Sequence, residues 1–293
     1  MARPKLQRIL ITGASGFIGR HVTSYLRRHG VTIRVYDRKL DTKNTLDNSK
    51  ALARAIQWSQ GVVHLAGQSS VFRAQQDPLA DAQTNIIGTL QLLEQLRHYP
   101  RLLVYPSTIA VYRSRSSGRS VETEAQPHSF YAAGKLVVEN YIRLYSEQYA
   151  VPGVSLRLGY VYANDVTRGP FADICGAVSR GEKSVKLFAS LRSSFDFIHV
   201  NDVASAMEAV LRRDLPAGTV LNISTGEATE VKEILRLATE HVGVSLPKVL
   251  VKSEAKPVRL VMDCRVARRL LGWRPRVSLN AGIKDYLLNY GRK

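Results

Sequence analysis

The 293-residue sequence predicts an α/β fold, in which a doubly wound parallel sheet is joined to a smaller, mixed C-terminal lobe. Three observations predict this fold class. Short apolar, β-branched runs alternate with helical patterns through the first half of the chain, as in parallel sheets covered by helices on both faces. A glycine-rich turn joins the first run to the first helical pattern. After about residue 159 the alternation weakens and mixed elements follow.

The first elements form a β-α-β unit. Apolar runs predict strands at residues 8–12 and 31–37, and the pattern between them predicts a helix at 17–29. The remaining elements of the first half are expected as strands at 62–65, 102–106 and 154–158 and as helices at 85–98 and 131–149. In the second half we expect a loop at 164–170, a strand at 195–200 and helices at 171–180, 203–212, 231–242 and 264–271.

The composition argues against a membrane protein or a disulfide-stabilised one. The apolar stretch near the N-terminus is broken at once by Thr12 and Gly13, and no segment approaches about 20 uninterrupted apolar residues. Cys175 and Cys264 lie far apart and have no metal-type spacing, so we interpret them as packing residues. We therefore expect a soluble, cytoplasmic protein without a metal site.

The chain is strongly basic, with 42 Lys and Arg against 24 Asp and Glu and a formal net charge of +18. Such an excess attracts polyanions. The basic residues are scattered in small groups, such as Arg27 with Arg28, and form no long run interleaved with aromatic residues. We interpret most of them as solvated helix faces that also favour a diphosphate ligand, and we expect no specific nucleic-acid partner.

The segment TGASGFIG places Gly13, Gly16 and Gly19 between the first strand and the first helix. The first glycine permits a tight turn, the second allows a pyrophosphate to approach the backbone, and the third allows the helix to pack closely on the strand. The helix N-terminus favours the negative charge of the ligand. These features predict a Rossmann-type dinucleotide site, because the flanking strand and helix are both in place.

Asp37 follows at the end of the second strand, where a carboxylate can accept hydrogen bonds from the ribose hydroxyls of an adenosine. Its charge would repel a 2′-phosphate, which favours NAD. Arg38 and Lys39 are next in the sequence and could accommodate that phosphate, so NADP remains open. The alternative interpretation of Asp37 is a turn residue at a strand end.

Tyr131 and Lys135 form a YxxxK pattern at the start of a predicted helix, where an i, i+4 spacing puts both side chains on one face. An ammonium beside a phenol favours the phenolate, so we expect Lys135 to lower the pKa of Tyr131. Thr108 lies in PSTIAVY, at the end of a buried-type strand, and can offer a hydroxyl to the same centre.

Motifs along essentially the whole chain resemble the extended short-chain dehydrogenase/reductase family, which comprises NAD-dependent nucleotide-sugar epimerases and dehydratases. They are, in family order, TGASGFIG, VVHLAG, NIIGTLQLLE, YPSTIAVY, YAAGK, SLRLGYVY, FDFIHVNDVA, NISTGE and LGWRP. The resemblance implies a dinucleotide-binding domain at residues 1–158, completed by about 195–223, and a substrate-binding lobe formed mainly by 159–293.

The resemblance also implies residue roles. Tyr131 would be the general base and acid at a sugar hydroxyl, Lys135 would hold the nicotinamide ribose, and Thr108 would hydrogen-bond the same hydroxyl. The cofactor would contact Gly13, Ser15, Gly16, Phe17, Ile18, Gly19, Asp37, Arg38, Leu65, Ala66, Gly67, Asn85, Ser107, Tyr131 and Lys135. The substrate would contact Ser69, Thr108, Tyr160 and Arg192.

Departures from the family pattern narrow the chemistry. Dehydratases of the family follow the catalytic Thr with an Asp-Glu pair, whereas Ile109 and Ala110 occupy those positions here and cannot transfer protons. Phe195 replaces an Arg that usually holds the nucleotide diphosphate, and Arg192 is our candidate substitute. The stretch from residue 37 to 62 is short for the family, and in it Asp47 is a candidate acid near the adenine.

The leading hypothesis is an NAD-dependent nucleotide-sugar epimerase, acting at C4 of an NDP-hexose through a transient keto-sugar. An NAD(P)H-dependent reductase of NDP-4-keto-sugars is the enzyme alternative, and a non-catalytic NAD-binding protein is a third. The resemblance also implies a homodimer through helices that include residues 131–149. The basic loop 113–120 would either close over an anionic substrate or be a solvated turn.

Overall fold

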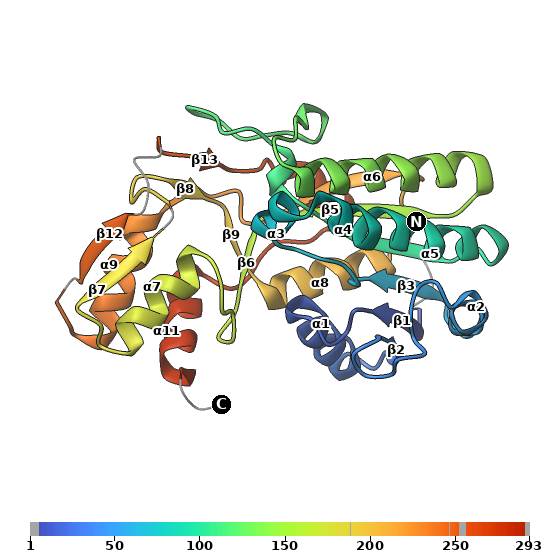
Figure 1. Ribbon diagram of the computed structural model, residues 1–293, viewed down its shortest axis with the longest axis horizontal. Coiled ribbons are helices and arrows are strands. Elements are labelled where there is room, and N and C mark those ends of the chain that lie inside the picture. Colours follow the sequence, from blue (N-terminus) through green and yellow to red (C-terminus); the bar gives the residue numbers. More distant parts are fainter. Residues whose placement is uncertain (1–5, 188, 246, 252–255, 291–293) are drawn as a thin grey trace.

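The computed structural model describes residues 6–187, 189–245, 247–251 and 256–290 (Figure 1). In these ranges the central sheet has six parallel strands, which confirms the predicted fold class. Their spatial order is β2 (Thr32–Tyr36), β1 (Arg8–Thr12), β3 (Gly61–His64), β4 (Leu102–Thr108), β5 (Gly153–Leu158) and β10 (Thr219–Ile223).

Helices cover both faces of this sheet (Figure 1). Because successive strand side chains point to opposite faces, Ile9 and Ile11 join one apolar cluster while Leu10 joins another. The first cluster includes side chains of α1 (Phe17–Arg28), α8 (Val200–Leu211) and α10 (Arg265–Leu271). The second includes side chains of α2 (Ser49–Trp58), α5 (Gly88–His98) and α6 (Phe130–Tyr149).

The connections on the two sides of β3 differ in length. Residues 37–60, all of which are described, contain the single helix α2, in keeping with the short spacing expected there. Between β3 and β4 the chain forms α3 (Val71–Gln76) and then a continuous helical stretch. That stretch consists of α4 (Pro78–Ala82), a π-helical turn η1 (Gln83–Ile87) and α5. The sequence pattern predicted only its second half.

The C-terminal lobe has its own core, formed by helices and short strands. Its helices are α7 (Pro170–Ser179), α9 (Val231–Val242) and α11 (Leu279–Asn289), which pack against one another. The strand pairs are β6 (Tyr160–Tyr162) with β9 (Phe197–His199), and β7 (Ser184–Leu187) with β12 (Lys248–Val251). In a third sheet β8 (Ser194–Phe195) lies between β11 (Thr229–Glu230) and β13 (Arg259–Leu260).

The strand expected at 195–200 is divided at Asp196, and its halves β8 and β9 belong to different sheets. The Asp196 carboxylate is fully buried and accepts hydrogen bonds from the Ser224 and Thr225 hydroxyls, at 2.6 and 2.7 Å, and from the Met262 backbone N–H, at 3.1 Å. Ser224 and Thr225 follow β10 of the central sheet, whereas Met262 follows β13 of the lobe. One carboxylate therefore joins the two parts of the molecule.

The last part of the chain returns to the central sheet. Trp273 belongs to the α1–α8 cluster and donates a hydrogen bond to the Ser205 hydroxyl at 2.8 Å.

The division of the chain near residue 158 into two domains stays a prediction. Among the described helices, none combines the length and the apolar character needed to cross a bilayer.

Candidate active site

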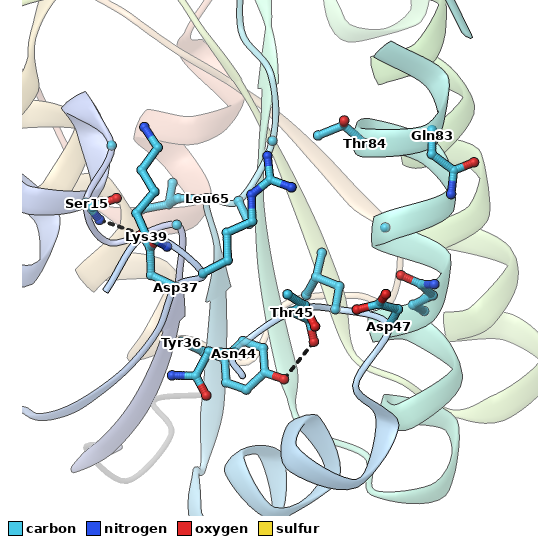
Figure 2. Close-up of a pocket in the computed structure, with 18 residues that line it drawn as sticks. Ser15, Tyr36, Asp37, Lys39, Asn44, Thr45, Asp47, Leu65, Gln83 and Thr84 are labelled. Carbon is cyan, nitrogen blue, oxygen red and sulfur yellow. Dashed lines mark hydrogen bonds between the residues drawn. The ribbon is translucent and has the colours of Figure 1, made fainter. Parts of the chain in front are cut away.

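Two adjoining clefts lie at the carboxyl ends of the central strands. The β2-side cleft, of about 350 Å³, lies between the turn after β1, the end of β2, residues 44–47 and the helical stretch at 83–91 (Figure 2). The β4-side cleft, of about 490 Å³, lies between the end of β4, the start of α6 and residues 158–169. Both include parts of the glycine turn and of the loop after β3. Ligands of open α/β sheets bind at this kind of strand-order reversal, here between β1 and β3.

The glycine turn is shaped for a close approach of backbone to ligand. Gly13 has φ of 67°, and a Cβ there would lie 2.4 Å from the Ala66 backbone nitrogen. A Cβ on Gly19 would lie 2.2 Å from the Gly13 carbonyl oxygen, so α1 packs directly on the turn. The first turn of α1 carries no acidic residue. This end of the helix therefore suits a diphosphate, as the sequence predicts.

The Asp37 side chain faces the turn from the end of β2 (Figure 2). Its carboxylate accepts hydrogen bonds from the backbone N–H groups of Ser15, at 2.8 Å, and Lys39, at 2.9 Å. Burial raises the pKa of Asp37, but the hydrogen bonds from Ser15 and Lys39 outweigh it and the net shift is downward. The residue is thus an anionic acceptor in the cleft wall, where a ribose would reach it. Asp47 also lines this cleft.

Most of the predicted ligand contacts line these clefts. The β2-side cleft is lined by the predicted cofactor residues Gly13, Ser15, Gly16, Asp37, Arg38, Leu65, Ala66 and Gly67. The β4-side cleft is lined by Phe17, Ile18, Gly19, Ser107, Tyr131 and Lys135 and by the predicted substrate residues Ser69, Thr108 and Tyr160.

Asn85 is not among the described residues that line either cleft. Its amide is occupied in supporting the loop after β3: Oδ1 accepts from the Gln68 N–H at 2.8 Å, and Nδ2 donates to the Gln68 carbonyl oxygen at 3.0 Å. The expected cofactor contact of Asn85 stays a prediction, and in the structure its amide supports Gln68, which lines the β4-side cleft. Sequence reasoning missed Gln68 because nothing in QSS marks one polar residue above its neighbours.

Thr108, Tyr131 and Lys135 come together at the β4-side cleft. Thr108 ends β4, Tyr131 lies on the first turn of α6, and the interaction of the two side chains lowers the pKa of the phenol. The Lys135 ammonium lies 5.9 Å from the centroid of the Tyr131 ring and donates to the Pro106 carbonyl oxygen at 2.9 Å. Because the phenol and the hydroxyl line the same cleft, both can reach one substrate oxygen.

The protonation of this pair differs from the expectation. Burial raises the pKa of Tyr131 above its ordinary value; the hydrogen bond with Thr108 opposes this and the charge of Asp81 adds to it. Burial lowers the pKa of Lys135 to about 8, against the charges of Asp81 and Glu139. The expected lowering of the tyrosine pKa by Lys135 is therefore wrong for the chain alone, because desolvation of the phenol dominates.

A buried ion pair lies behind the reacting side chains. Glu139, one helical turn beyond Lys135, accepts hydrogen bonds from Arg157 of β5 at 2.6 and 3.0 Å and from the Ser107 hydroxyl. Both charged side chains are about 4% exposed or less. Arg157 also donates to the Tyr112 hydroxyl at 2.9 Å. These bonds fix α6, which carries Tyr131 and Lys135, against β5 and against β4, which carries Thr108.

The substrate end of the β4-side cleft has an aromatic wall and one exposed cation. Tyr160 lines the cleft, and its ring centroid lies 4.5 Å from that of Phe195 and 5.8 Å from that of Phe197. Arg192 is exposed and is not among the described lining residues, and its expected contact with the diphosphate stays a prediction. Arg168, from the loop before α7, lines the cleft instead. Its sequence neighbours give no signal of this role.

The basic loop 113–120 is bound to the C-terminal lobe. The Arg115 N–H donates to the Arg259 carbonyl oxygen at 3.1 Å, and Arg119 Nε donates to the Gly226 carbonyl oxygen at 2.6 Å. The described residues that line the two clefts do not include its arginines. The structure gives no support to closure of this loop over a substrate.

The chain is similar to known proteins over most of its length. The model of the NAD dependent epimerase/dehydratase family matches residues 9–224. A UDP-glucose 4-epimerase from Mycolicibacterium smegmatis is 28% identical, over 94% of this chain and 96% of that protein.

Two solved structures have the same fold over nearly their whole length. A Thermus thermophilus UDP-glucose 4-epimerase in complex with NAD has a TM-score of 0.84 and 31% identity, covering 96% of this chain and 97% of that one. A Thermotoga maritima UDP-glucose 4-epimerase with UDP-glucose has a TM-score of 0.87 and 28% identity, covering 97% and 99%. With its glycine turn, its ribose-side carboxylate and its Thr-Tyr-Lys set, the chain belongs to the NAD-dependent epimerase/dehydratase family of enzymes.

Proposed function

We propose that this enzyme epimerises a nucleoside-diphosphate hexose at C4, through a transient keto-sugar. The observation that carries the proposal is the composition of the β4-side cleft. Among the described residues that line it there is a phenol, a threonine hydroxyl and a lysine, but no aspartate or glutamate. Elimination of water needs a further acid and base beside the sugar. One phenol that takes up and returns one proton suffices for epimerisation.

The chain's own residues then have distinct tasks. Tyr131 accepts the proton of the C4 hydroxyl as the carbon is oxidised, and returns it when the carbon is reduced. Thr108 holds the same oxygen, so that the proton moves along a fixed hydrogen bond. Lys135, held by the Pro106 carbonyl, places a positive charge beside the phenol and the ribose. NAD, when bound, supplies the acceptor for the hydride of C4 and the source from which it returns to the other face.

The experiment is incubation of the NAD-loaded protein with UDP-glucose and, separately, with UDP-GlcNAc, followed by NMR. Formation of the C4 epimer without net consumption of cofactor is the expected result. Tyr131→Phe should abolish conversion while NAD still binds. No conversion of any common NDP-sugar would overturn the proposal, and stoichiometric oxidation of NAD(P)H with a keto-sugar would assign the chain as a reductase.

Arg168 is our candidate for contact with the diphosphate, because it is the exposed cation that lines the substrate end of the β4-side cleft. Arg168→Gln should raise the KM for the NDP-sugar about tenfold or more and leave kcat within about twofold, since the lost contact is equal in ground and transition states. Arg192→Gln is the matched control and should leave KM unchanged. Equal effects of the two substitutions would contradict the assignment.

The proposal includes a homodimer. Large apolar side chains are exposed on α3, α4 and α6, which pack against one another: Phe72 is 69%, Leu79 78% and Phe130 51% exposed. Exposed apolar side chains on helices that pack against one another favour an interaction surface. Leu79→Arg should convert a dimer into a monomer in light scattering. We also propose a cytoplasmic location, with which two buried cysteines that form no disulfide agree.

A further inference from the structure

Asp81 is a buried carboxylate near the reacting side chains that the mechanism above does not use. It lies in the short helix α4, one residue before the helix ends, and is 4% exposed. Its Oδ1 accepts hydrogen bonds from Gln68 Nε2 at 2.7 Å and from Asn85 Nδ2 at 2.9 Å. Both of these donors are neutral amides, so among the described residues no cation is hydrogen-bonded to Asp81. A buried carboxylate without a directly bonded cation is costly, so a compensating charge close by is expected.

The contact between α4, which carries Asp81, and α6 indicates which charge compensates the Asp81 carboxylate. α4 packs against α6, and Asp81 Oδ2 lies 3.6 Å from the place of a Cβ on Gly134. Gly134 lies between Tyr131 and Lys135 in the first turns of α6. The Lys135 ammonium is buried too, and it donates a hydrogen bond to the neutral carbonyl of Pro106. Carboxylate and ammonium therefore compensate one another across the helix contact without forming an ion pair.

The same carboxylate also shapes the cleft wall. Gln68 lines the β4-side cleft, and its amide nitrogen is held by Asp81. Its amide oxygen accepts a hydrogen bond from the Ser70 N–H, and its backbone is held by Asn85. The side chain of Gln68 is thereby fixed at both ends.

We propose that Asp81 is a positioning residue of this enzyme: it holds Gln68 at the cleft wall, and its charge sets the pH range in which Tyr131 and Lys135 work. The inference rests on the roles proposed above for Tyr131 and Lys135. Asp81 lines neither cleft and is not a catalytic residue.

The sign of the effect follows from the charges that face the pair. The negative charge of Asp81 disfavours the phenolate and favours the ammonium, so it raises the pKa of both Tyr131 and Lys135. Glu139 of α6 acts in the same direction on Lys135, but it is paired with Arg157.

Two further titratable groups face Lys135 from the central sheet. Burial lowers the pKa of His64, on β3, to about 3, and raises that of Tyr105, on β4, above its ordinary value. Both are neutral near pH 7, so they add no charge that could mask the effect of Asp81.

The test is Asp81→Asn in the NAD-loaded protein. Both donors use the one oxygen Oδ1, so asparagine can keep both hydrogen bonds and removes only the charge. The ionisation of Tyr131 is followed by 13C NMR of ring-labelled tyrosine, with Tyr131→Phe to assign the signal, and kcat/KM is measured against pH. We expect the pKa of Tyr131, and both limbs of the pH profile, to move to lower pH by about 0.5–1 unit.

The matched control is Asp77→Asn, which removes a charge from the exposed start of the same helix and leaves an acceptor for the Ala80 N–H. It should leave both measurements unchanged. Gln68→Met keeps the Asp81 charge, so it should raise KM without moving the Tyr131 titration. An unmoved titration in Asp81→Asn, or an equal movement in Gln68→Met, would overturn the inference. The NMR titration needs no turnover, so it tests Asp81 even if no NDP-sugar is converted.

Discussion

The ion pair between Glu139 and Arg157 predicts a large loss of stability when one partner is removed. Glu139→Gln leaves the guanidinium of Arg157 buried without its counter-charge. Removing one partner of a buried pair costs about 3–5 kcal/mol. For a chain of this length, the usual entropy of unfolding per residue converts that loss into a fall in Tm of about 5–8 °C.

Differential scanning calorimetry of the protein without added ligand measures this fall. Glu147→Gln is the control on the same helix, because its partner Arg143 is solvent-exposed and such pairs contribute about 1 kcal/mol or less. The double substitution Glu139→Leu with Arg157→Met should lose less than the two single ones together, since no charge is left unpaired. A Tm for Glu139→Gln within about 1 °C of the wild type would refute the reasoning.

Three further predictions concern the β2-side cleft and the loop before α7, in which Asp165 contacts α1. Gly16→Ala should fold normally, because φ at Gly16 is −69° and the new Cβ meets only the Gly13 carbonyl oxygen, at 3.2 Å. The new methyl group should block the diphosphate and so weaken NAD binding at least about tenfold in a fluorescence titration. An unchanged affinity for NAD would contradict the role given to this glycine. Asp37→Asn should lower the ratio of NAD to NADP affinity about tenfold, since the repulsion of a 2′-phosphate is lost. An unchanged ratio in isothermal titration would show that other residues select NAD over NADP. Burial raises the pKa of Asp165, but its hydrogen bonds with His21 and Arg20 outweigh this and bring the pKa to about 2, so its stabilisation is present above pH 4 and disappears as pH falls from about 4 to 2. The difference in urea midpoint between wild type and Asp165→Asn should shrink over that interval, and a constant difference would count against this link.

The local parts of the site were predictable because each depends on residues close together in the sequence. The glycine turn, Asp37 at the strand end and the Tyr131–Lys135 helix face follow from backbone geometry and side-chain spacing alone. The structure brings all of them to one edge of the sheet.

The long-range parts of the site could not be predicted in this way. Arg168 reaches the cleft while Arg192 does not, because the packing of α7 and β8 in the C-terminal lobe decides which loop faces the sheet. Similarly, Asn85 has the residue type of a ligand contact, but the π-helical turn that carries it directs its amide to Gln68. The pKa of Tyr131 depends on desolvation, which no spacing of residues in a sequence reports.

The carboxylate of Asp196 has a consequence for how the molecule comes apart. Its acceptor oxygens bind groups that follow β10 and groups that follow β13, so separating the two parts would leave a buried charge without its donors. Melting of one part should therefore carry the other with it, as a single cooperative heat-absorption peak.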